Sequence, residues 1–154
     1  MNAVKMLKAD HDRVQKLFKE FEAAGERAYE KKRGIAEEVF TELEIHTKLE
    51  EEIFYPAVQA RADKEGEELL AESLQEHHVV DVLMGEMRKL DPGNDEYQAK
   101  FQVLMENVEH HIEEEEGEMF PMASERLGDT LDSLGTKMEE RKQELQTSGP
   151  AGRR

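Results

Sequence analysis

The sequence predicts an all-α protein: an up-down-up-down four-helix bundle with a short additional C-terminal helix. Its 154 residues are the size of one domain, and its composition is rich in Glu, Lys, Ala, Leu and Met, which favour helix. Four long stretches repeat apolar residues every three or four positions, the spacing that places side chains on one face of an α-helix. The links between these stretches are short, which favours antiparallel neighbours in a bundle.

The expected elements follow the apolar spacing and its interruptions. Gly25 ends the first stretch, the segment DPGN (91–94) ends the third, and Pro56 and Pro121 fall near the ends of the second and fourth. A fifth, weaker helix follows Gly128. The expected helices cover residues 4–24, 35–61, 67–90, 95–126 and 129–144.

These elements are expected to form one domain over residues 1–146. Within it, residues 1–125 form the bundle and residues 128–146 form the C-terminal helix. The last residues, 147–154, contain glycine, proline and serine without apolar spacing, so we expect a disordered tail there.

Charge and cysteine content exclude several classes of function. The net charge is -16, and a chain this acidic has no basic surface for nucleic acid or for an anionic membrane. It has no cysteine, which excludes disulfides, thiolate metal sites and cysteine nucleophiles. The first residues lack the apolar run of a signal peptide, and no apolar run reaches membrane-spanning length. We therefore expect a cytoplasmic protein that binds neither nucleic acid nor membrane.

Each of the four apolar stripes contains one histidine near its middle. The third stripe, for example, carries Leu70, Leu74, His77, Val80 and Met84. In the second and fourth helices a glutamate follows the histidine by four residues, so the two side chains share a helix face. The candidate site residues are His11, His46, Glu50, His77, His111 and Glu115.

The two halves of the chain resemble each other. HTKLEEEIFYP (46–56) aligns without gaps with HIEEEEGEMFP (111–121), and the histidine, both glutamates and the proline match. An acidic residue also precedes both His11 and His77. One helix pair is therefore expected to be used twice, which gives a pseudo-two-fold bundle and suits a site for two equivalent ions.

A metal centre explains why these polar residues occupy apolar faces. A buried carboxylate without a partner is costly, and a divalent or trivalent ion supplies the compensating charge. Imidazole and carboxylate together suit iron, manganese or zinc, and a carboxylate can bridge two ions. Two six-coordinate ions need about twelve ligand positions, of which four histidines and two bridging carboxylates supply about eight. Positions remain for a bridging atom, for water or for a small substrate.

The quoted motifs resemble the hemerythrin-like family, also called the HHE cation-binding domain, in its bacterial single-domain form. The matching pieces are Asp10-His11, HTKLEEEIFYP (46–56), EHH (76–78) and HHIEEEEGEMFP (110–121), and the resemblance covers about residues 1–125. It implies a four-helix bundle around two iron ions joined by an oxo or hydroxo bridge. By position it implies that His11, His46, Glu50, His77, His111 and Glu115 are the ligands, with both glutamates bridging the irons.

Several positions near the expected centre stay open. We favour His77 over His78 and His111 over His110, because the neighbouring faces carry fewer apolar residues. Asp81, Tyr55 and Glu116 are each candidates to complete the coordination or to orient a ligand. Oxygen-carrying members of the family have a histidine where this chain has Asp81. That difference favours an open centre for sensing or redox turnover over reversible oxygen carriage.

Three functional hypotheses follow. The leading one is a non-haem di-iron protein that binds or senses dioxygen or a related small oxidant. The second is a di-iron enzyme that acts on hydrogen peroxide or nitric oxide. The third is a helical interaction protein in which the metal is only structural, and the sequence identifies no protein partner.

Overall fold

The computed structural model describes residues 1–148, and those residues form helices and loops with no β-strand. The prediction of an all-α protein is therefore confirmed. The long helices are α1 (Ala3–Ala23), α2 (Tyr29–Leu49), α4 (Lys64–Met87), α5 (Asp95–Glu114) and α7 (Thr130–Ser148). The shorter elements are α3 (Tyr55–Gln59), α6 (Phe120–Leu127) and two π-helical turns, η1 (Glu50–Phe54) and η2 (Glu115–Met119).

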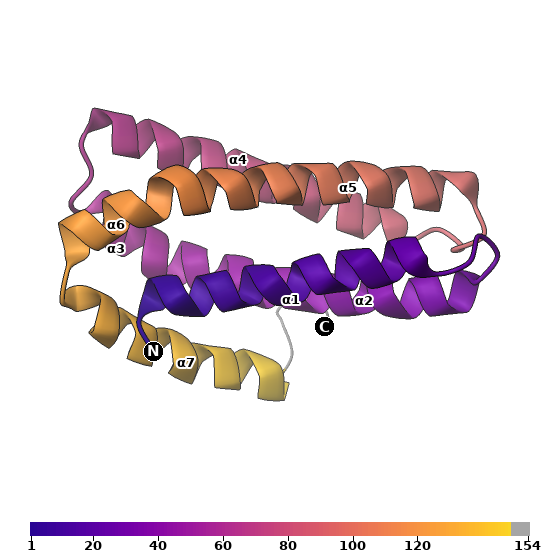
Figure 1. Cartoon of the computed structure of the whole chain (residues 1–154), viewed down its shortest axis with the longest axis horizontal. Coiled ribbons are helices and arrows are strands. Elements are labelled where there is room, and N and C mark those ends of the chain that lie inside the picture. The colour runs from indigo at the N-terminus through magenta and orange to yellow at the C-terminus, as the bar shows by residue number, and fades with distance from the viewer. Residues whose placement is uncertain (149–154) are drawn as a thin grey trace.

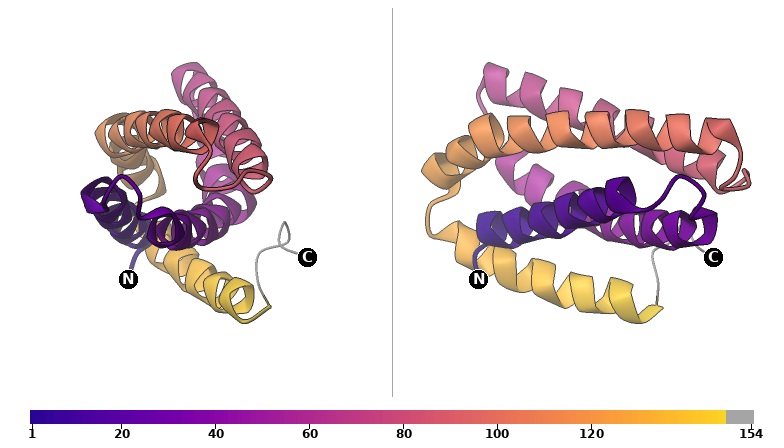
Figure 2. Two further views of the ribbon diagram at one scale, coloured as in Figure 1. Left: turned by 90° about the vertical axis from the view of Figure 1, so that its right-hand side faces the viewer. Right: turned by 45° about the vertical axis from the view of Figure 1, so that its right-hand side comes forward.

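The helices lie side by side along one long direction (Figure 1). α1 packs against α2, and α4 packs against α5, with a chain reversal at one end of each pair. α3 and α6 continue the lines of α2 and α5 at the opposite end of the molecule. α7 lies outside the bundle against α1 and α2, whereas the outer side of α4 faces away from it (Figure 2).

Local side-chain caps set the starts of α1, α4 and α5. Asn2, Asp63 and Asn94 each accept a hydrogen bond from a backbone N–H in the first turn of the helix that follows. Gly128, at φ +50°, ends α6 in a conformation that favours glycine. Because Asp63 is such a cap, α4 begins at Lys64 and not at the expected residue 67.

The expected helices 35–61 and 95–126 are each interrupted by a π-helical turn. In η1 the N–H of Tyr55 donates to the carbonyl of Glu50, and in η2 the N–H of Phe120 donates to the carbonyl of Glu115. A proline without an N–H follows directly in each case, so an ordinary helical bond is missing there. Each π-helical turn begins at one of the two glutamates of the expected centre. Such turns inside helices are often found at functional sites.

The apolar core consists of two clusters along the bundle. One includes Leu7, Phe54 and Phe120, together with Met138 of α7, and the other includes Phe40 and Met84. Along each helix, the expected histidine lies between residues of one cluster and residues of the other, as His11 lies between Leu7 and Val14. One expected core position is wrong: Leu74 is 42% exposed, and Ser73 is buried at that level of α4.

The C-terminal helix α7 begins at Thr130 and continues to Ser148. It therefore extends two residues into the segment expected to be a disordered tail, and residues 149–154 lie outside the described part of the chain. Leu131, Leu134 and Leu145 of α7 are buried against the first cluster. No helix in residues 1–148 is long and apolar enough to cross a membrane.

Candidate metal centre

The structure brings all six candidate residues into one buried site. Two of the three groups of potential ligand atoms in the described chain form this site, and within each group the atoms lie within 4.8 Å of one another. The first group is His11, His46, Glu50 and Glu115. The second group is Glu50, His77 and His111. Glu50 therefore belongs to both groups, as a bridging carboxylate would.

Each helix pair of the repeat supplies an equivalent part of this site. α1 and α4 present His11 and His77, while α2 and α5 present His46 and His111 in their last turns. The two glutamates stand at the first positions of η1 and η2, and both are fully buried. The π-helical turns thus lie where each chain segment passes the centre.

All four candidate histidines of the centre are oriented by a carboxylate in the same way. In each imidazole Nδ1–H donates to an acidic side chain, which leaves Nε2 directed to the interior site. The acceptors are Glu116 for His11 at 2.7 Å, Asp10 for His46 at 2.9 Å, Glu51 for His77 at 2.7 Å and Glu76 for His111 at 2.6 Å.

These carboxylates follow the internal repeat. Asp10 and Glu76, which precede the histidines of α1 and α4, each hold the histidine of the next long helix. Glu51 and Glu116, which follow the buried glutamates, each reach across to the other half of the bundle. Asp10 is also paired with Lys142 of α7, at 2.9 Å. The sequence showed that these acids recur, but their partners depend on packing between helices.

Tyr55 breaks the symmetry of the centre. Its ring stacks on His77, and the ring of Phe120, its counterpart in the repeat, stacks on His11. Only Tyr55 has a hydroxyl, which donates to Glu115 Oε2 at 2.7 Å and lies 3.3 Å from His77 Nε2. The sequence alone leaves the role of Tyr55 open, and the structure places its hydroxyl among the candidate ligands on one side of the centre.

The donor set fits a bound metal. His46 Nε2 and Glu50 Oε2 are 3.3 Å apart, and neither has a hydrogen-bond partner in the described chain although both are buried. Unpaired buried polar atoms are rare in folded proteins because they cost the full desolvation of the group. A cation between these atoms would satisfy both, and four imidazoles with two carboxylates are suitable ligands for iron, manganese or zinc.

The metal-free centre balances its charge with protons. Burial lowers the pKa of His111, but Glu115, Glu50 and Glu76 outweigh burial and raise it to about 12. Burial likewise opposes the charge of His46, yet Glu50 and Asp10 raise its pKa well above the usual value. Burial and the charge of Glu115 both act to raise the pKa of Glu50. The nearby imidazoles outweigh them by favouring the ionised carboxylate, and the pKa is lowered to about 2. The raised pKa values of His46 and His111 both favour the protonated imidazoles, and a metal that binds them would have to displace those protons.

Metal binding is consequently expected to release protons and to tighten as pH rises. Zn²⁺ added to metal-free protein in weakly buffered solution at pH 7 should release at least the protons of His46 and His111, measured with a pH indicator. The His110→Ala variant, changed outside the centre, should release as many. Release of clearly fewer than about two protons per chain would contradict this charge balance.

The competing residues lie outside the two ligand groups. His78 is exposed, and the His110 side chain is 62% exposed beside Glu76 and Glu114. The Asp81 residue is also classed as exposed. Partial burial of its carboxyl group and the nearby charge of Glu51 raise its pKa. Glu116 contacts Nδ1 of His11 and is not in either ligand group.

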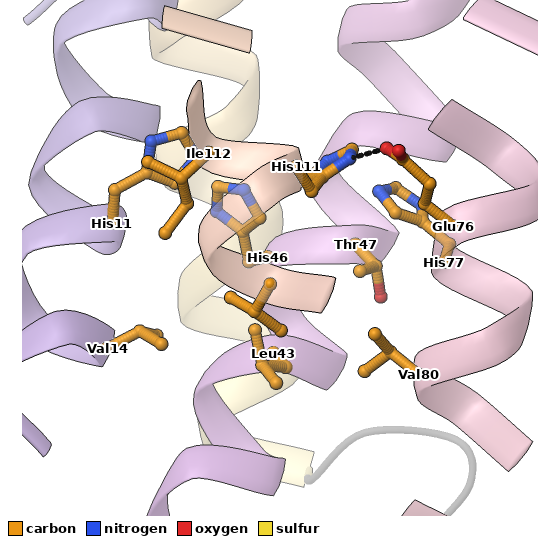
Figure 3. Close-up of a pocket in the computed structure, with 11 residues that line it drawn as sticks. His11, Val14, Leu43, His46, Thr47, Glu76, His77, Val80, His111 and Ile112 are labelled. Carbon is orange, nitrogen blue, oxygen red and sulfur yellow. Dashed lines mark hydrogen bonds and ion pairs between the residues drawn. The ribbon is translucent and has the colours of Figure 1, made fainter. Parts of the chain in front are cut away.

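A cavity of about 30 Å³ adjoins the centre. All four inner histidines line it, and Val14, Leu43 and Val80 line the side away from them (Figure 3). A volume of this size holds about two waters or one diatomic molecule. The site therefore combines metal-binding groups with a small, largely apolar space.

Comparison with known proteins identifies similar chains. The model of the hemerythrin HHE cation binding domain matches residues 2–123. Uncharacterized proteins of Mycobacterium tuberculosis and Mycobacterium bovis are each 29% identical over 96% of this chain and 89% of their own length. A crystal structure of an HHE cation binding domain-containing protein, the Mycobacterium kansasii homolog of the M. tuberculosis protein, superposes with a TM-score of 0.81. It is 27% identical, and the match covers 96% of this chain and 89% of that one.

Proposed function

We propose that this chain, which belongs to the hemerythrin HHE cation-binding domain family, is a non-haem di-iron protein. In this proposal the protein binds or senses dioxygen or a related small oxidant. The observation that carries this proposal is the pair of ligand groups that share Glu50 beside a diatomic-sized cavity. The cytoplasmic location remains a prediction from the sequence.

The two ligand groups support an assignment of residues to two irons. His11 and His46 would hold one ion, His77 and His111 the other, and Glu50 would join them. Glu115 is in the first group, and its other oxygen lies 3.4 Å from His111 Nε2, so it reaches both sides as well. When bound, the iron pair supplies reversible one-electron redox chemistry and open positions for a small ligand.

The size of the cavity restricts which molecules fit beside this centre. The cavity excludes anything much larger than a diatomic molecule or peroxide, and its aliphatic wall of Val14, Leu43 and Val80 offers no hydrogen bond. The four carboxylates that accept hydrogen bonds from the imidazole Nδ1–H groups fix the orientation of the rings. The centre therefore needs little rearrangement when a ligand enters. These features favour dioxygen, peroxide or nitric oxide as the small ligand.

A second candidate function, dismutation of hydrogen peroxide, is favoured by Tyr55. Two peroxide molecules give two waters and one dioxygen, so protons must move between oxygen atoms. The Tyr55 hydroxyl is the phenol in the site, and it already donates to Glu115. It is therefore placed to hold or pass a proton at that carboxylate.

The two functions are separated by the behaviour of iron-loaded protein. Under the leading proposal, the protein binds dioxygen or nitric oxide stoichiometrically and changes its near-ultraviolet absorption, without sustained turnover of peroxide. Sustained release of dioxygen from hydrogen peroxide by protein carrying about two irons per chain would favour the enzyme. Loss of any response in iron-loaded protein would contradict both.

Replacing Tyr55 with phenylalanine tests its part in either function. The change recreates the Phe120 side of the repeat, so the iron content should be retained. If peroxide is turned over, its rate should fall at least about tenfold, because a positioned proton donor is lost. The Tyr29→Phe variant, the same change at an exposed tyrosine at the start of α2, is the control and should keep its rate. An unchanged rate in Tyr55→Phe would remove Tyr55 from the reaction.

A further inference from the structure

The outer face of α4 carries exposed apolar side chains. Leu74 and Val79 are 42% exposed and Val82 is 44% exposed, all within little more than two turns. Val103 of α5 is also 44% exposed, and the ion pair of Lys100 with Glu86 places this part of α5 beside α4. α7 covers the other half of the bundle and leaves this side open (Figure 2).

The internal repeat provides a matched comparison for this face. The position equivalent to Leu74 on α1 is Lys8, and that equivalent to Val82 is Lys16. Both lysines are exposed, as their apolar counterparts are. Two surfaces of common architecture therefore differ in chemistry, and only the one on α4 is suited to burial.

The centre of the exposed α4 face has the spacing of a helix-pairing stripe. Steps of four, three, four and three residues separate its members, the spacing of positions a and d in a coiled coil. The stripe is Ala71, Gln75, His78, Val82 and Gly85. It contains no acidic residue, lysine or arginine, and its small residues allow a second helix to approach closely.

Charges beyond the stripe favour one orientation of a second helix. Glu67 and Glu68 are exposed at its start, and Lys89 is exposed just past its end. If two copies of α4 pair in opposite directions about His78, Glu67 of one copy is level with Lys89 of the other. In the same register Leu74 is level with Val82. Parallel pairing would instead bring the glutamates of the two copies together.

We propose that this face binds a second copy of the chain, with the two α4 helices antiparallel and the two-fold axis at His78. A two-fold interface needs a self-complementary surface, which the apolar, small and charged positions of α4 provide. The inference is independent of the proposed redox function. An interface built mainly on one helix is at the small end for protein complexes, so we expect association in the micromolar range.

Sedimentation equilibrium of the iron-loaded full chain tests the proposal. Over about 1–200 µM the average mass should rise from one chain of 17.8 kDa toward twice that value. The Val82→Glu variant should raise the dissociation constant at least about tenfold, because a charge would be buried in the contact. The matched variant Lys16→Glu, at the equivalent position on α1, should leave it unchanged. Circular dichroism and iron content confirm that both variants fold.

Cross-linking tests the orientation, because the natural chain has no cysteine. A mixture of Leu74→Cys and Val82→Cys chains, treated with a bismaleimide about 10 Å long, should link the two variants to each other. Preferential self-linking of each variant would indicate parallel pairing and overturn the proposed arrangement. A monomeric mass over the whole concentration range, or a dimer that Val82→Glu does not weaken, would overturn the proposal itself.

Discussion

The Glu50→Gln variant is expected to lose both metal ions. Glu50 is the residue present in both ligand groups, and it lies 3.0 Å from His77 Nε2 and 3.3 Å from His46 Nε2. An amide keeps the shape of the side chain but removes the negative charge that would join two cations. Loss of an outer-shell partner alone typically costs about 10–100-fold in metal affinity, and loss of a shared ligand should cost more.

Iron content measured by mass spectrometry after loading and desalting provides the readout. Wild-type protein should keep about two irons per chain, and Glu50→Gln should keep clearly fewer than one. Glu52→Gln is a suitable control because Glu52 is exposed and pairs with Arg141 of α7. It should retain the wild-type content. If Glu50→Gln keeps about two irons per chain, the shared-ligand assignment is wrong.

The second large effect is expected from His111, and the adjacent His110 provides the control. His111→Ala should lose at least one iron, because its Nε2 lies beside Glu115 and its Nδ1–H is held by Glu76. His110→Ala should keep both, since its side chain is 62% exposed. The pair is well matched because the substitutions are identical and lie one residue apart on α5.

Thermal unfolding with and without iron gives an independent readout of the same pair. A ligand that binds only the folded state adds RT ln(1 + [L]/Kd), about 4 kcal/mol at a thousandfold excess over Kd. Iron should therefore raise the melting temperature of wild-type protein and of His110→Ala, and raise that of His111→Ala much less. The opposite ranking would show that the wrong face of α5 had been assigned to the site.

Much of the fold follows from the sequence because the helices are long and their apolar spacing is regular. The all-α class and the positions of the helices could be predicted in this way. Helix starts were less accurate: α2 begins at Tyr29, six residues before the expected start, without a side-chain cap that would have marked it. The prediction that Leu74 is buried is wrong, because the structure buries Ser73 instead. Both positions suit a helical core stripe that starts at Leu70, since Ser73 lies three residues and Leu74 four residues further along the chain.

The inner histidines could be predicted because burial follows helical spacing. His77 and His111 lie on the stripe of their helix and face the site, whereas His78 and His110 lie one residue off that stripe. Whether the inner residues bind metal stays a prediction.

Other parts of the site depend on contacts between helices. The pairing of Asp10 with His46, and of Glu51 with His77, joins residues 36 and 26 positions apart and has no periodic signal. Tyr55 could be identified from the sequence as a candidate, but its hydrogen bond to Glu115 joins residues 60 positions apart and has no periodic signal. The π-helical turns had a signal in Pro56 and Pro121, but a proline alone does not distinguish a helix end from a widened turn.

Anomalous diffraction from crystals of iron-loaded protein, recorded on both sides of the iron absorption edge, tests the central proposal most directly. Our account predicts two iron peaks, one among His11, His46 and Glu115 and the other beside His77 and His111, with Glu50 reaching both. A single peak would contradict it. So would iron found only at the third, partly exposed group of potential ligands, which consists of Glu72, Glu76, His110 and Glu114.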